Sequence, residues 1–72
     1  MESLSFAELM KNAILYAAED ESYFYVKVKE DYDLSNAMWK VDKKTKKVSY
    51  IDYTDFIVNI EDGTKEIDPN AL

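Results

Sequence analysis

Residues 37–52 have the sequence AMWKVDKKTKKVSYID, and this stretch decides the fold. Apolar and polar side chains alternate on both sides of a lysine-rich centre, which is typical of two β-strands joined by a tight turn. The predicted loop has four residues, Lys43 to Lys46. Its last position usually requires a positive φ, so we expect strain of about 1 kcal/mol at Lys46, where glycine would fit easily. The register places three pairs of residues opposite one another: Val41 with Val48, Trp39 with Tyr50, and Met38 with Ile51.

The stretch upstream of this hairpin also alternates with a period of two, from Tyr23 to Lys29. This pattern predicts a half-buried strand that is followed by a loop rich in turn-forming residues, from Glu30 to Ser35. Three strands in succession predict an antiparallel β-meander. The first strand carries Phe24, Val26 and Val28 on one face and Tyr23, Tyr25, Lys27 and Lys29 on the other.

The N-terminal segment has the period of an amphipathic helix. Ser5 and Glu8 form a capping box at its predicted start, and the helix would end near Ala18. We expect it to cover the sheet face that carries Ala37, Trp39, Val41, Val48 and Tyr50. The predicted fold class is therefore α+β, with residues 1–72 forming one small acidic domain. The apolar positions of the helix are Phe6, Leu9, Met10, Ala13, Ile14 and Ala17.

The segment after Thr54 has two interpretations. In the first, Thr54 caps a short helix that runs through Asp62 and ends at Gly63, with Phe56, Ile57 and Ile60 facing Met38 and Ile51. In the second, Phe56 to Ile60 is a fourth strand, and a turn at Asp62 and Gly63 leads into Lys65 to Ile67. The cap residues favour the helix slightly. Pro69 to Leu72 is predicted to be a loose terminus.

The composition excludes much of the chemistry that a small protein could perform. The chain has no histidine, cysteine or arginine, and its 15 carboxylates and 9 lysines give a net charge of −6. It therefore lacks a side chain whose ordinary pKa is near neutral pH, and it lacks a thiolate that could act as a nucleophile or metal ligand. A single glycine leaves no phosphate-binding loop. We expect no enzymatic activity, no cofactor and no metal, and the spacing of Asp31, Asp33, Ser35 and Asp42 matches a calcium loop poorly.

The start of the sequence has no basic region of the kind that precedes a secretory signal, and no apolar run reaches the ~20 residues of a membrane helix. A cytoplasmic location is therefore expected, without membrane contact.

Acidic and tyrosine side chains supply the candidate binding residues. Two acidic clusters flank the first strand, and tyrosines, which are frequent at interface hot spots, lie between and beside them. We expect this surface to bind a basic, nucleic-acid-binding partner protein by charge mimicry, as small inhibitors from phage and mobile elements do. Direct binding of nucleic acid is not expected, because the net charge would repel phosphate. The alternative is an assembly protein that self-associates or joins a larger subunit through the first strand, if that strand lies at a sheet edge. The tyrosine face of the strand is either open to a partner or covered by the tail segment, Phe56 to Ile60. The candidate residues are Glu19, Asp20, Glu21, Tyr23, Tyr25, Glu30, Asp31, Tyr32 and Asp33.

Overall fold

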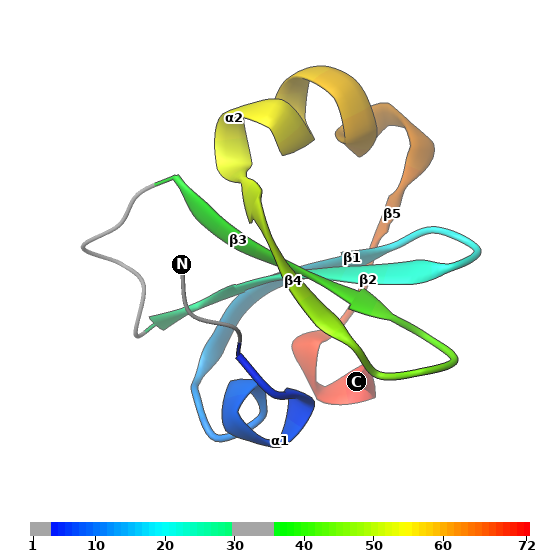
Figure 1. The fold of residues 1–72 in the computed structure, drawn as a ribbon. Helices are drawn as coiled ribbons and strands as arrows, with labels where there is room; N and C mark the ends of the chain where they lie inside the picture. Colours follow the sequence, from blue (N-terminus) through cyan, green and yellow to red (C-terminus); the bar gives the residue numbers. More distant parts are fainter. Residues whose placement is uncertain (1–3, 30–35) are drawn as a thin grey trace.

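A computed structural model describes residues 4–29 and 36–72 (Figure 1). Its strands form one antiparallel sheet in the order β4-β3-β2-β1-β5. The α+β class with a small antiparallel sheet is confirmed, but the described residues contribute five strands to the sheet where three were predicted. The strands are β1 (Ile14–Glu19), β2 (Tyr23–Val28), β3 (Ala37–Asp42), β4 (Val48–Asp52) and β5 (Lys65–Glu66).

The helical elements are short. α1 (Phe6–Leu9) precedes the sheet, and η4 (Pro69–Ala71) is a 3-10 turn after it. Between β4 and β5 the chain forms α2 (Tyr53–Asp55), the π-helical η2 (Phe56–Ile60) and the 3-10 helix η3 (Glu61–Gly63). We call this continuous segment, residues 53–63, the helical cap. Within the described ranges, no helix has the length and apolarity needed to cross a membrane.

The predicted long N-terminal helix is wrong. The capping box at Ser5 and Glu8 forms, but the helix ends at Leu9 and the chain continues as β1. β1 contacts an apolar core on each face, because Ala17 belongs to one core and Ala18 to the other, whereas Leu15 near its start is exposed. A strand buried on both faces has a nearly continuous apolar sequence, so the period of two that would reveal it is hidden. The acidic residues that follow therefore lie in a turn and not at a helix C-terminus.

The predicted hairpin is confirmed. β3 and β4 pair in the expected register, with Trp39 opposite Tyr50. Lys46 has a φ of 63°, and it is the one non-glycine residue with positive φ in the described part of the chain. The Asp42 carboxylate accepts hydrogen bonds from the backbone N–H groups of Lys44 and Thr45. The bond from Thr45, followed by that from Lys44, lowers the pKa of Asp42, so the carboxylate stabilises the turn in its charged form.

Apolar cores lie on both faces of the sheet. The first core includes Trp39, Val41 and Val48, as expected, and α1 contributes Leu9 to it. Leu72 also packs against this core, so the prediction of a loose C-terminus is wrong. The buried members of the first core are Leu9, Ala17, Val26, Val28, Trp39, Val41 and Val48.

The second core lies between the sheet and the helical cap (Figure 1). It consists of the buried residues Ala18, Tyr25, Met38 and Phe56. The helical interpretation of the tail is confirmed, although the N-cap is Asp52, whose side chain accepts from the Thr54 N–H. Phe56 and Ile60 face this core as predicted, whereas Ile57 points outward.

Candidate protein-binding surface

Asp20, the central residue of the first predicted acidic cluster, stabilises the β1–β2 turn. Its Oδ1 accepts hydrogen bonds from the N–H groups of Ser22 and Tyr23, both at 2.8 Å, and its Oδ2 accepts from the Tyr25 hydroxyl at 2.7 Å. Partial burial raises the pKa of Asp20. The hydrogen bonds, with that from Tyr25 foremost, and the Lys43 charge outweigh this burial and leave the pKa below its ordinary value. The carboxylate is therefore occupied within the fold.

The two neighbouring acids differ in their surroundings. Glu19 is half-buried, and its Oε1 lies 2.9 Å from the Lys43 Nζ in an ion pair. Glu21 is exposed at the tip of the turn. Of the three acids in this cluster, Glu21 is the one whose side chain is available to a partner without breaking a contact described above.

The tyrosines of β2 are mostly covered. Tyr25 is only 4% exposed and packs against Phe56, with ring centroids 5.3 Å apart. Burial, then the hydrogen bond to Asp20, raises the pKa of its hydroxyl. Tyr23 is half-buried, and the Lys40 Nζ lies 4.4 Å from its ring centroid. The helical cap covers this face of the strand, so Tyr25 offers no contact area to a partner.

The second predicted acidic cluster, Glu30, Asp31 and Asp33, lies outside the described residues, as does the candidate Tyr32. β2 itself is a central strand that pairs with β1 on one side and β3 on the other. It therefore has no free edge to offer another chain, so the condition for pairing through this tyrosine-rich strand is not met.

A different surface emerges on the helical cap. Val58 is 72% exposed and Ile57 is 46% exposed, although both are β-branched apolar residues. The turn is π-helical here, with the Glu61 N–H donating to the Phe56 carbonyl five residues earlier. Such wide turns are frequent at functional sites. Phe56 anchors the segment, which leaves the next two side chains facing solvent.

Acidic side chains surround this apolar pair. Asp55, Glu61 and Asp62 are exposed on the same segment, and Asp55 accepts a hydrogen bond from the Asn59 amide. Glu66 on β5 is exposed as well. Burial, followed by the charges of Glu61 and Glu66, raises the pKa of the Tyr16 hydroxyl. We call Asp55, Ile57, Val58, Glu61, Asp62 and Glu66 the cap surface.

The sequence contains the signal for this surface, an apolar pair flanked by acids at positions 55–62, but gives no sign that the pair faces outward. Among the described residues, no group of three or more carboxylates could hold a metal ion. No ion pair joins the cap-surface carboxylates to a lysine within the described ranges. The cap surface is therefore a negatively charged rim around exposed apolar side chains.

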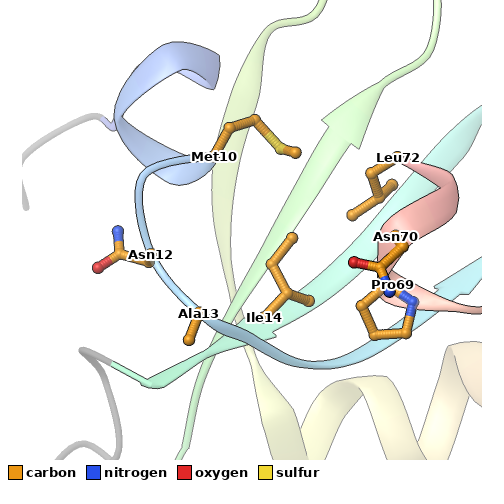
Figure 2. Close-up of a pocket in the computed structure, with 7 residues that line it drawn as sticks. All are labelled: Met10, Asn12, Ala13, Ile14, Pro69, Asn70 and Leu72. Carbon is orange, nitrogen blue, oxygen red and sulfur yellow. The ribbon is translucent and has the colours of Figure 1, made fainter.

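Two shallow hollows lie elsewhere on the molecule. Figure 2 shows the larger, of about 300 Å³, between the loop after α1 and the C-terminal turn, with Met10, Ile14 and Leu72 among the residues that line it. None of its lining side chains ionises. The smaller, of about 200 Å³, lies between the β1–β2 and β3–β4 turns. There Asp42 is bound to the backbone of its own turn.

Comparisons of the chain with protein-family models, curated proteins and solved structures give no significant match. We therefore infer function from the surface chemistry of this chain.

Proposed function

We propose that the protein is an interaction module that binds a basic surface of a partner protein through the cap surface. The observation that carries the proposal is the exposure of Val58 and Ile57, at 72% and 46%, within a rim of exposed carboxylates. Exposed apolar side chains that are rimmed by polar residues are characteristic of protein–protein contacts. The apolar pair would supply the desolvated centre of the contact, and the acids its charged rim.

The charge of the cap surface defines the chemistry of the partner. The chain has a net charge of −6, and no lysine of the described residues forms an ion pair with a cap-surface carboxylate. Both features favour association with a positively charged protein. Electrostatic steering would accelerate this association, and salt would weaken it. Nucleic-acid-binding proteins have basic surfaces of this kind. An acidic module bound there would inhibit by occupying the site.

The test compares two charge reversals of equal size. The first is Glu61→Lys on the cap surface, and the second is Glu21→Lys in the β1–β2 turn. Both glutamate side chains are exposed. Wild type and both variants are used as tagged baits in a lysate of the source cells at low salt, followed by salt-step elution and mass spectrometry. The affinity of each recovered basic protein is then measured by calorimetry at two salt concentrations.

We expect Glu61→Lys to weaken binding by at least about tenfold, which corresponds to ~1.4 kcal/mol, and Glu21→Lys to leave it nearly unchanged. Val58→Ser should weaken it as well, without altering the charge. If Glu21→Lys alone abolishes binding, the binding site is the acidic β1–β2 turn and not the cap surface. If neither charge reversal changes the affinity, the proposed recognition of a basic surface is wrong.

A further inference from the structure

β4 is the outermost strand of the sheet, and no described strand pairs with its outer edge. An open edge presents backbone N–H and C=O groups that can pair with another chain. The opposite end of the sheet is the two-residue strand β5, which is too short to offer a comparable edge. β4 is therefore the best-formed free edge in the described part of the molecule.

The hydrogen bonds at the two ends of β4 show which backbone groups face outward. The Asp42 N–H donates to the Lys47 carbonyl at 2.9 Å, and the Tyr53 N–H donates to the Asn36 carbonyl at 2.6 Å. Hydrogen-bonded and non-hydrogen-bonded pairs alternate along an antiparallel ladder. Val48, Tyr50 and Asp52 therefore direct their N–H and C=O groups away from β3.

The charges beside β4 determine which kind of strand fits this edge. Exposed lysines at positions 44, 46 and 47 precede the strand, whereas Asp52 and Asp55 are exposed at its other end. A second copy in antiparallel orientation would place the lysine end of each strand beside the acidic end of the other. A parallel copy would bring like charges together, which destabilises a pair of neighbouring strands. Charge complementarity thus favours one occupant, a second copy of this chain related by a twofold axis.

We propose that two copies of the protein pair antiparallel through β4, with Tyr50 next to the twofold axis, so that one continuous sheet crosses both copies. Tyr50 is 37% exposed, and its ring lies against Trp39 with centroids 5.7 Å apart. The mate's Tyr50 lies on the same face of the continuous sheet and covers the exposed part of this ring. The proposal does not rest on the proposed function, because the backbone groups that pair belong to β4. Asp55, beyond the end of the strand, is the residue that the dimer contact shares with the cap surface.

Sedimentation velocity from micromolar to millimolar concentration tests the proposal with two matched variants. Tyr50→Pro removes an outward N–H group, whereas Tyr50→Thr keeps it, and both lose the ring that contacts Trp39. We expect a concentration-dependent dimer of wild type that weakens with salt. Tyr50→Pro should raise the dimer dissociation constant by about 100-fold or more relative to Tyr50→Thr, because the backbone bonds at the axis are lost. A monomeric wild type, or equal dimer stability in the two variants, would overturn the proposal.

Amide hydrogen exchange of the wild type provides a second readout that does not depend on how well the variants fold. The N–H groups of Val48 and Tyr50 have no acceptor on β3, so they should exchange rapidly in the monomer. Their exchange should slow as the protein concentration rises, while that of Ser49 and Ile51, which face β3, should change much less. Fast exchange of Val48 and Tyr50 at all concentrations would contradict pairing through this edge.

Discussion

The hydrogen bond between the Tyr25 hydroxyl and the Asp20 carboxylate supports a quantitative prediction. The change Tyr25→Phe removes a 2.7 Å bond to a charged acceptor and keeps the ring that packs against Phe56. Hydrogen bonds to charged groups contribute about 1.5–3 kcal/mol, and Asp20 is partly exposed and keeps two backbone donors, so the lower limit applies. We expect the free energy of unfolding to fall by about 1.5 kcal/mol. This corresponds to a fall in Tm of roughly 6–12 °C for a chain of this size.

The effect should depend on pH in a defined direction. The folded state lowers the pKa of Asp20, so the carboxylate stabilises the protein above its unfolded pKa of about 3.9. This contribution is lost as the pH falls through the lower, folded value. Tyr25→Phe brings the folded pKa closer to the unfolded one. The difference in stability between wild type and Tyr25→Phe should therefore be full at neutral pH and decrease below about pH 4.

Urea denaturation monitored by tryptophan fluorescence, from neutral pH to about pH 3, measures both effects. Tyr50→Phe is the matched control, since it also removes one hydroxyl, from a ring that is 37% exposed. The reasoning is refuted if the two variants lose equal stability at neutral pH. It is also refuted if the loss in Tyr25→Phe stays constant as Asp20 becomes protonated.

Three further substitutions test the local structure by urea denaturation. Lys46→Gly should raise the free energy of unfolding by about 0.5 kcal/mol. Glycine adopts the positive φ without strain, but the variant loses the contacts of the Lys46 Nζ with the rings of Phe6 and Phe24. An unchanged free energy of unfolding would mean that the turn is unstrained. Phe56→Ala should lower the free energy of unfolding by about 3–5 kcal/mol, since the Phe56 side chain is 0% exposed. A decrease below ~1 kcal/mol would show that Phe56 does not anchor the helical cap. Asp52→Ala should lower the free energy of unfolding by about 1 kcal/mol, and Asp52→Ser should lower it much less, because serine can still cap α2. Equal decreases in the two variants would argue against capping by Asp52.

The hairpin and the orientation of the helical cap could be predicted because their signals are local. The register of β3 and β4 follows from the loop between them, and the inward position of Phe56 follows from the apolar pattern that it shares with Ile60. β1 could not be predicted in the same way. Ile14 to Ala18 is a short apolar run, and only the presence of a core on each face shows that it is a strand.

The candidate site was harder to predict than the fold, because availability to a partner depends on tertiary contacts. Asp20 is bound by a hydroxyl five residues away, and this contact requires the β1–β2 turn to form first. The sequence left open whether the face that carries Tyr25 is exposed or covered by residues 56–60, and the helical cap covers it. Conversely, Val58 is exposed because the π-helical turn is anchored through Phe56. Sequence alone gives the charge of these residues but not which of them remain free.

The pairing of β5 with β1 has a consequence for the order in which the molecule assembles. β1 to β4 are neighbours in sequence as well as in the sheet, so they can form while the rest of the chain is still being synthesised. β5 must return from the far end of the helical cap to pair with Ala18 and Glu19 through two residues. Compared with the other strand pairings, the pairing of β5 with β1 closes the longest loop and so costs the most conformational entropy, and it forms through the fewest residues. Brief detachment of β5 in the finished protein would thus open the outer side of β1 to proteases while the four-stranded meander stays folded.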